Sequence, residues 1–303
     1  MADLPGCPAC GQHTNRVIDS HDAFTLRRCF KCDLVFADPM AAVDPSYYQG
    51  HVVYSHKTVG DAQGERAHLD GRRIAWMEAL TQPGSKMLDI GCGSGAFVAC
   101  SRDAGRVAYG IDFNDQEISL GNAAFNLDGF LMKTDVLSMP EEWSGFDLIT
   151  MFEVIEHLPN PKQVIQEVYR RLKDGGYLVL SCPNERRWQP AGRIFVDYPP
   201  HHLTRWTPKC LQQFLESNSF EYVDTEIDAS LHDILWTAYV NRRVRSKSVT
   251  SAPTQEAKHS SNWKWALDRV VRIVCLPFDA LLKFLHIGTL GMRIVVRKPS
   301  HGS

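Results

Sequence analysis

The chain has 303 residues, of which 44% are hydrophobic and 22% are charged, and its formal net charge is -2. This size predicts one main domain with appendages and a sizeable buried core. The nearly neutral charge gives no overall basic field, so the composition does not support general nucleic-acid binding.

Two pairs of cysteines mark the start of the chain, Cys7 with Cys10 and Cys29 with Cys32. The C-x2-C, loop, C-x2-C spacing is typical of a four-thiolate zinc site. The stretch between the pairs is too short and polar to bury a core, so zinc would supply its folding energy. Residues 1–40 are therefore predicted to form a structural zinc ribbon, with a recognition module or a redox dithiol as the alternatives.

The other five cysteines are scattered in apolar segments, which favours buried thiols in a reducing compartment. The first residues lack the basic and apolar order of a signal peptide. No uncharged apolar run is long enough to span a bilayer. These features predict a cytoplasmic protein.

Residues 41–83 are predicted to join the ribbon to the main domain. The first part is rich in proline and tyrosine, including Tyr47, Tyr48 and Tyr54. We expect these tyrosines to pack between domains or over the mouth of a cofactor site. Residues 65–80 have helical apolar spacing, and Pro83 and Gly84 end that helix.

The main domain, residues 84–228, begins with the stretch KMLDIGCGSG. A short apolar strand runs into a turn containing Gly91, Gly93 and Gly95, and a helical segment follows. Glycines let the backbone approach a ligand closely, and the free amides at a helix N-terminus favour a negative group. This order predicts a nucleotide-cofactor site. The pattern also fits a dinucleotide fold, so an NAD enzyme stays open at this point.

Strands and helices alternate along the rest of the domain, which predicts an α/β, Rossmann-like, doubly wound sheet of seven strands. Asp112 ends the second strand about twenty residues beyond the turn, where a ribose-binding acid belongs. Asp135 ends the third strand. After the first strand, the predicted strands cover residues 107–111, 130–132, 146–152, 177–182, 220–227 and 292–296, and further helices cover 164–172 and 209–217.

The motifs LDIGCGSG, YGIDFN, KTDVLSMP, FDLITMFEVIEHLPNP and LKDGGYLVLSCPN occur in this order over about two thirds of the chain. Together they resemble the class I S-adenosylmethionine-dependent methyltransferases. The resemblance implies S-adenosylmethionine as the cofactor. It places Asp89 near the methionine amino group, Asp112 at the ribose, and Asp135 with Val136 at the adenine.

A narrower resemblance comes from the cysteine ribbon, EVIEHLPNP and PPHHLTRWTP. These features are similar to those of small-molecule methyltransferases of sugar, surface-polysaccharide and natural-product pathways. The resemblance implies methylation of a hydroxyl on a sugar-like or lipid-linked intermediate. Two rivals remain: an RNA methyltransferase that uses the ribbon to hold RNA, and a noncatalytic cofactor-binding adaptor.

Glu153, Glu156 and His157 follow the fourth strand directly. On a helix their i, i+3, i+4 spacing would place all three on neighbouring surface. A sulfonium methyl group is already activated, so the enzyme needs alignment and removal of a proton. His157 is the predicted base, oriented by a glutamate. In the structural alternative, the two glutamates cap the helix and His157 holds the loop that follows it.

His201 and His202 lie in a loop predicted to overhang the same pocket, and two adjacent histidines are expected to differ in role. In small-RNA ribose methyltransferases a similar E-x-x-E-H segment and a later histidine bind a divalent metal, and quinone O-methyltransferases have a similar E-V-x-E-H segment. The matching set here is Glu153, Glu156, His157 and His202, which are adequate metal ligands. Arg205 and Trp206 are expected to close a lid.

Residues 229–290 form an insertion before the last strand and tail, residues 291–303. The insertion is first basic and polar, and then apolar with interspersed Lys and Arg. Packing against the domain or a second subunit is one prediction for this apolar part. Peripheral membrane contact through residues 263–287 is the other.

Overall fold

The computed structural model describes residues 5–41, 58–67, 69, 71–188, 193, 195–228, 230–231, 235, 274–275, 277–279, 281–282, 288 and 291–300. The three linker tyrosines and most of the insertion, including most of residues 263–287, lie outside these ranges. Within the ranges, no helix is both long and apolar enough to cross a membrane.

A seven-stranded sheet forms the centre of the molecule, as predicted, with the strand order β10-β11-β8-β7-β4-β5-β6. β11 runs antiparallel to β10 and β8 on its two sides, and the other pairs of neighbouring strands in this sheet are parallel. The central strands are apolar runs buried on both faces, as a parallel sheet covered by helices requires. The strands are β4 (Lys86–Ile90), β5 (Val107–Asp112), β6 (Leu131–Lys133), β7 (Phe146–Phe152), β8 (Leu172–Pro183), β10 (Glu221–Ile227) and β11 (Gly291–Arg297).

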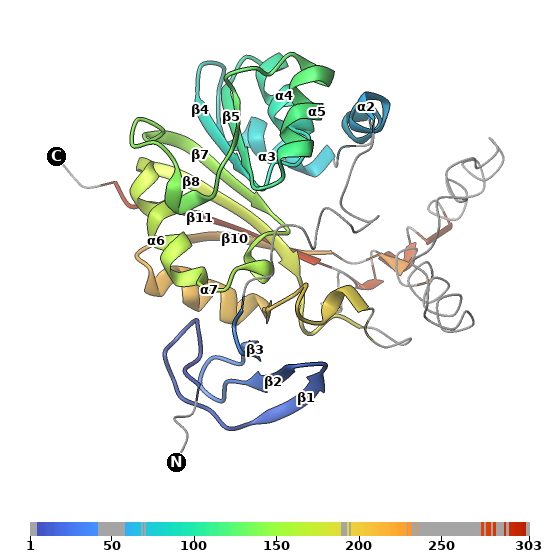
Figure 1. Ribbon diagram of the computed structural model, residues 1–303, viewed down its shortest axis with the longest axis vertical. Helices are drawn as coiled ribbons and strands as arrows, with labels where there is room; N and C mark the ends of the chain where they lie inside the picture. The colour runs from blue at the N-terminus through green and yellow to red at the C-terminus, as the bar shows by residue number, and fades with distance from the viewer. Residues whose placement is uncertain are drawn as a thin grey trace.

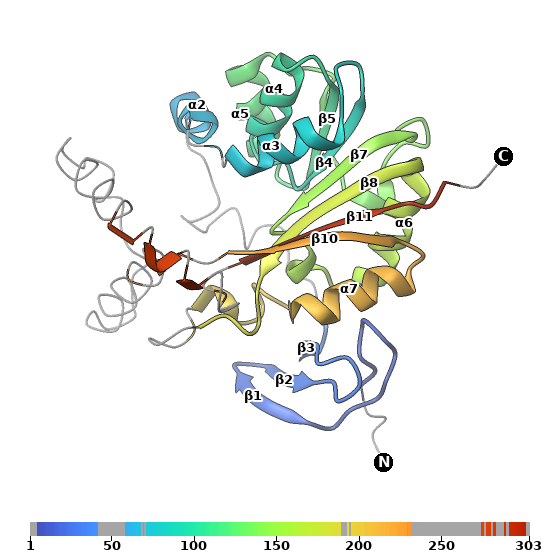
Figure 2. The same ribbon diagram turned by 180° about the vertical axis from the view of Figure 1, so that it is seen from behind.

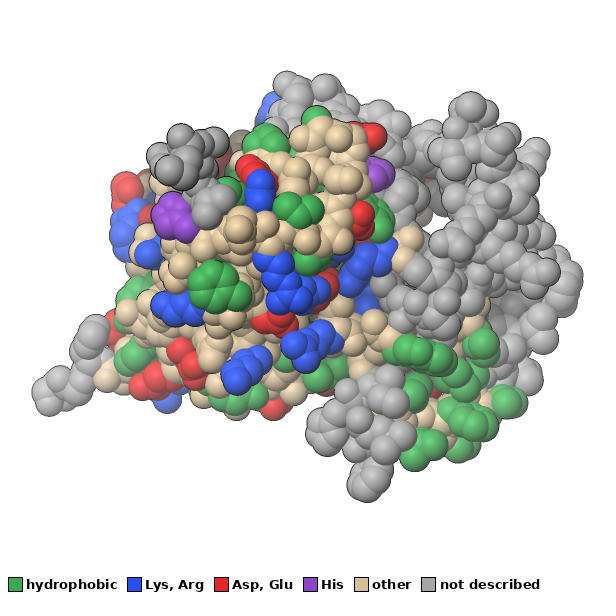
Figure 3. All heavy atoms as spheres, turned by 90° about the horizontal axis from the view of Figure 1, so that it is seen from below, with side chains coloured by type: hydrophobic (Ala, Val, Ile, Leu, Met, Phe, Trp, Pro, Cys, Tyr) green, Lys and Arg blue, Asp and Glu red, His purple; other side chains and the backbone are tan. Residues whose placement is uncertain are grey.

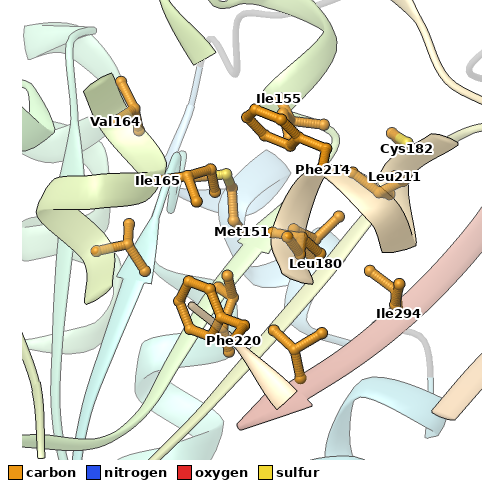
Figure 4. Close-up of a cluster of buried hydrophobic side chains, with 14 of the residues drawn as sticks. Met151, Ile155, Val164, Ile165, Leu180, Cys182, Leu211, Phe214, Phe220 and Ile294 are labelled. Carbon is orange, nitrogen blue, oxygen red and sulfur yellow. The ribbon is translucent and has the colours of Figure 1, made fainter. Parts of the chain in front are cut away.

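Helices cover both faces of this sheet (Figures 1 and 2). On one face lie α3 (Gly71–Leu80), α4 (Ala96–Asp103) and α5 (Asp115–Phe125), with α2 (Val59–Ala67) beside α5. On the other lie α6 (Pro161–Arg171) and α7 (Pro208–Ser217). Figure 4 shows the core on this second face, where Ile165 and Phe214 pack with Met151 and Leu180 of the sheet.

The single helix expected at residues 65–80 is wrong, because the structure has α2 and α3 in its place. α2 ends at Ala67, and α3 begins at Gly71. Glycine is a poor helix former, so Gly71 favours a break between the two helices over one continuous helix.

The cysteine-bearing segment forms β1 (Val17–His21), β2 (Phe24–Arg28) and β3 (Val35–Asp38). A two-residue strand from the main domain, β9 (Thr204–Arg205), pairs with β3 and completes a four-stranded sheet. The ribbon lies next to α7 in Figures 1 and 2. Its sheet therefore contains part of the loop that follows the two histidines.

Candidate functional site

The glycine turn after β4 has the conformation that only glycine adopts readily. Gly91, Gly93 and Gly95 have φ values of 73°, 54° and 74°. A Cβ atom added at Gly91 would lie 2.5 Å from Cγ2 of Val154. The turn therefore packs directly on the segment that follows β7, and α4 begins immediately after it.

Asp112 lies at the end of β5, beside this turn. Its Oδ2 accepts a hydrogen bond from the backbone N–H of Gly93 at 2.9 Å, and its Oδ1 accepts one from Asn114 at 2.8 Å. Burial raises the pKa of the Asp112 carboxyl. The structure thus brings the predicted ribose ligand and the glycine turn together at the carboxyl end of the sheet.

Asp89 lies next to the last residue of β4, and its side chain is buried. Its Oδ1 accepts a hydrogen bond from the Thr150 hydroxyl at 2.7 Å. Burial raises the pKa of Asp89 to about 7. The nearby charge of Arg73 favours the ionised carboxylate, and that of Glu65 opposes it.

Arg73 is a residue that the sequence analysis missed, because nothing in the pattern of α3 distinguishes it from a solvated arginine. Its guanidinium lies over the Phe152 ring, 4.3 Å from the centroid. Its charge acts on both Asp89 and Glu153. A guanidinium at this place can bind the carboxylate of a ligand seated in the turn.

Asp135 caps the short 3-10 helix η1 (Val136–Ser138) with its exposed carboxylate. Its Oδ1 accepts hydrogen bonds from the backbone N–H groups of Leu137 and Ser138, at 2.8 and 3.0 Å. Val136 is buried. Both residues follow β6, the neighbour of β5, and their contact with adenine stays a prediction.

The EVIEH segment is not the helix that its spacing indicated. Only Ile155–His157 form one 3-10 turn, η2, and Glu153 precedes it with a positive φ of 57°. Prolines at 159 and 161 prevent an α-helix from continuing, and α6 begins instead at Pro161. The Glu153 carboxylate accepts a hydrogen bond from the Ser181 hydroxyl at 2.7 Å.

Three histidines converge beside η2. One ring nitrogen from each of His157, His201 and His202 lies within 4.8 Å of the others. The two adjacent histidines thus lie in one cluster, with their rings stacked and the ring centroids 4.8 Å apart. His157 Nδ1 lies 2.7 Å from the carbonyl oxygen of His201. Because a carbonyl only accepts, Nδ1 carries the proton, and Nε2 carries the lone pair of the neutral ring.

Glu156 completes this histidine cluster. Its side chain is 1% exposed, and neither carboxyl oxygen has a hydrogen-bond partner among the described residues. Its Oε1 lies 3.9 Å from Nε2 of both His157 and His202. Burial and the nearby Glu153 raise the pKa of Glu156 well above its usual range.

The imidazoles of His157 and His202 are neutral near pH 7. Burial lowers the pKa of His157 to about 4. Burial also lowers the pKa of His202, and the neighbouring histidines lower it further. Neutral imidazoles around an orphaned buried carboxyl group suit a divalent cation, which would displace the carboxyl proton. The same lone pair on His157 can instead accept a proton.

The loop residues Arg205 and Trp206 do not form the expected lid. Trp206 is completely buried, packs on Phe214, and donates its indole N–H to the Thr204 hydroxyl at 2.8 Å. Arg205 is also buried and lies over the Tyr198 ring. Both side chains are therefore buried, and Trp206 belongs to the main hydrophobic core.

The four ribbon cysteines have the dimensions of a tetrahedral thiolate site. Their sulfur atoms all lie within 4.8 Å of one another, and the Cys7–Cys32 and Cys10–Cys29 sulfurs are each 3.6 Å apart. Tetrahedral zinc with bonds of about 2.3 Å places sulfurs about 3.8 Å apart. The donor set therefore fits zinc, and all four cysteines are free of disulfides.

Comparisons with known proteins converge on one domain type. Residues 61–225, more than half of the chain, match the family model for a methyltransferase domain. A ubiquinone biosynthesis O-methyltransferase of Pseudomonas fluorescens (strain Pf0-1) is 27% identical over 150 residues, which are 47% of this chain and 62% of that protein. Its counterpart in Dechloromonas aromatica (strain RCB) is 32% identical over 144 residues, or 45% and 60% of the two chains.

These matches cover less than two thirds of the length of either relative. A solved structure, a SAM-dependent methyltransferase from Archaeoglobus fulgidus, is also similar, with a TM-score of 0.51 and 20% identity. The match covers 78% of this chain and 96% of that one, and at this identity it shows the fold alone.

Proposed function

The chain belongs to the methyltransferase domain family, and from this premise we propose that it transfers the methyl group of S-adenosylmethionine to a hydroxyl of a sugar-like or lipid-linked small molecule. One observation carries the proposal: the glycine turn beside Asp112 packs on Val154, between the β7 end and the histidine cluster. A cofactor on the turn would thus place its methyl group close to groups that can activate a hydroxyl.

Each group around the glycine turn has a role in the proposal. The glycine turn receives the carboxylate end of the cofactor, and Asp89 receives its ammonium group. Asp112 accepts from the ribose hydroxyls, and Asp135 with Val136 borders the adenine. The two acids near the turn also favour the positive charge of the cofactor.

His157 acts on the acceptor, either as the base or as part of a metal site. Its Nε2 lone pair faces Glu156, and neither Glu156 oxygen has a hydrogen-bond partner among the described residues. This orphaned carboxyl favours a cation held by Glu156, His157, His201 and His202. Such a cation would supply a Lewis acid that orients the acceptor hydroxyl and lowers its pKa. The proposed set has His201 in place of Glu153, because the Glu153 carboxylate accepts a hydrogen bond from the Ser181 hydroxyl.

A chelator distinguishes the mechanism in which His157 is a base from the one in which the cluster binds a metal ion. With a chelator that leaves the ribbon cysteines loaded, activity should persist if His157 is a simple base. If the cluster holds a cation, activity should fall, and added magnesium, manganese or cobalt should restore it. Full activity in His157→Ala would contradict both mechanisms.

We also propose that the cysteines hold one structural zinc ion, since a closed four-thiolate site leaves no open catalytic position. Elemental analysis of protein purified without added metal should find one zinc per chain. Cys29→Ser should lose it. Absence of metal, or a disulfide between the cysteine pairs, would contradict the assignment.

An untargeted labelling experiment identifies the class of the methyl acceptor. Purified protein, methyl-labelled cofactor and fractionated cell extract should give label in the small-molecule or lipid fraction. Label that appears instead in RNA would support the main rival. That rival needs a continuous basic face from the ribbon to the pocket.

The described face around the ribbon does not have that uniform charge. Figure 3 shows acidic and apolar side chains among the lysines and arginines of this face. On the ribbon itself, Arg16 and Lys31 are exposed, but so are Asp19 and Asp22. This mixture favours a small-molecule acceptor over RNA.

A further inference from the structure

We propose that the four-cysteine ribbon is a positioning element for the histidine cluster, so that metal at the cysteines sets the geometry of methyl transfer. The consequence for catalysis rests on the proposed function, whereas the structural coupling can be tested without any methyl acceptor. The sequence alone indicated a ribbon whose metal serves only its own fold. The contacts of β9 make that ribbon part of the framework around the histidine cluster.

The first contact is the strand pair between β3 and β9. Val35 pairs with Arg205, and Phe36 pairs with Thr204. In addition, the backbone N–H of Ala37 donates to the carbonyl oxygen of Leu203 at 2.8 Å. Residues 203–205 follow His202 directly, so the last strand of the ribbon holds the chain that leaves the histidines.

The same short segment is tied on its other side to η2. The backbone N–H of Leu203 donates to the carbonyl oxygen of Glu156 at 2.8 Å. The Thr204 hydroxyl donates to the carbonyl oxygen of Ile155 at 3.4 Å. β9 therefore lies between the ribbon and the turn that carries Glu156 and His157, and it fixes the two halves of the histidine cluster relative to each other.

The cysteines themselves touch the main domain. Cys210, at the start of α7, belongs to the same buried cluster as Cys7 and Cys29, and Cys32 packs against that cluster. Cys7 and Cys29 belong to the same buried cluster as Trp206 and Phe214. Any rearrangement of the thiolate site would thus reach the segment that joins β9 to α7.

Ion pairs next to the cysteines add a second attachment. Arg28 Nη2 lies 2.7 Å from Oε1 of Glu185, whose side chain is 4% exposed. Arg186 Nη2 lies 2.9 Å from Oδ2 of Asp33. The backbone N–H of Glu185 donates to the carbonyl oxygen of Trp206 at 2.8 Å. These pairs join the ribbon to residues 185–186, and Glu185 is in turn hydrogen-bonded to Trp206 on the other side of the histidine loop.

Loss of the ribbon metal should therefore act locally. A short polar ribbon without its metal lacks the apolar core needed to keep β3 in place. Without β3, the residues after His202 lose one of their two hydrogen-bonding neighbours. The glycine turn is instead held through β5, because Gly91 and Cys92 both donate to the carbonyl oxygen of Ile111.

Hydrogen exchange of the full-length chain tests this coupling. Cys29→Ser should lose zinc, and amides in residues 198–206 should exchange at least about tenfold faster. Residues 89–95 should keep their exchange rates, and the affinity for S-adenosylhomocysteine should not change. Cys100→Ser, which alters a partly buried thiol on α4, is the matched control and should leave zinc and both segments as in the parent chain.

A second variant isolates the strand pair from the metal. Ala37→Pro removes the N–H that donates to Leu203 and leaves every cysteine in place, and Ala37→Gly retains that N–H. Exchange in residues 198–206 should rise in the proline variant, with zinc still bound. The proposal is wrong if these residues stay protected in zinc-free Cys29→Ser, or if that variant loses cofactor binding as well, since the ribbon would then support the whole domain.

Discussion

Asp112 connects the cofactor turn to β5 through a single carboxylate. In Asp112→Ala the ribose hydroxyls would lose a charged acceptor, and each such hydrogen bond contributes about 1.5 to 3 kcal/mol. We expect calorimetry to show cofactor affinity weakened by about one to two powers of ten. Asp115→Ala, an exposed acid in the first turn of α5, is the control. Equal affinities in the two variants would remove Asp112 from the site.

Asp89 should make cofactor affinity depend on pH. Its pKa of about 7 in the cofactor-free protein means that the carboxyl is mostly protonated at pH 6, and only the ionised form attracts an ammonium group. Affinity should therefore rise about eightfold from pH 6 to 7.5 and level off above that. Asp89→Asn should abolish this slope. A flat profile in the parent chain would show that Asp89 does not meet the cofactor.

The sequence predicted the two acids beside the glycine turn but only part of the histidine cluster, and the cofactor contacts of those acids stay predictions. Asp112 is recognisable because it ends a strand about twenty residues beyond the glycine turn, and Asp89 because it belongs to the motif that leads into that turn. By contrast, the inclusion of His201 depends on its backbone carbonyl meeting His157, a contact between residues 44 positions apart. Arg73 was missed for the same reason, since only the packing of α3 brings it to Asp89 and Glu153.

At the scale of elements, the glycine turn and the EVIEH segment depend on close packing. Gly91→Ala would combine a strained positive φ with a clash against Val154. Gly84→Ala is the control, because Gly84 also has a positive φ, of 90°, but a Cβ added there would have no atom within 4 Å. Strain alone should cost about 1–2 kcal/mol in each variant. The clash should add about 1–3 kcal/mol in Gly91→Ala only. Equal midpoints of urea unfolding would show that Val154 does not constrain the turn.

Element prediction succeeded where a pattern was long and failed where it was short. The buried strands β4, β7 and β8 follow from their apolar runs, and α7 from its apolar stripe after Thr207. β9 has only two residues and pairs with β3, more than 160 positions earlier in the chain, so no local pattern could reveal it. The EVIEH spacing fitted a helix, but the prolines beyond it allow only one 3-10 turn.

At the scale of the whole molecule, the two predicted modules share a β-sheet. The seven-stranded sheet carries the glycine turn and Asp112, and the last strand of the ribbon pairs with β9 after the histidine loop. Sequence patterns could indicate each module, because each carries its own motif. The sheet that they share depends on the pairing of β3 with β9, two strands far apart in the sequence, and neither motif indicates that pairing.

The formation of S-adenosylhomocysteine tests methyl transfer at this centre most directly. In extract that contains the acceptor, the parent chain should form S-adenosylhomocysteine and the labelled methyl product in equal amounts. His157→Ala should bind S-adenosylmethionine with the parent affinity and form none, because His157 acts on the acceptor rather than the cofactor. Equal turnover by His157→Ala would contradict the assigned centre. No turnover by a parent chain saturated with S-adenosylmethionine would instead indicate a noncatalytic cofactor-binding protein.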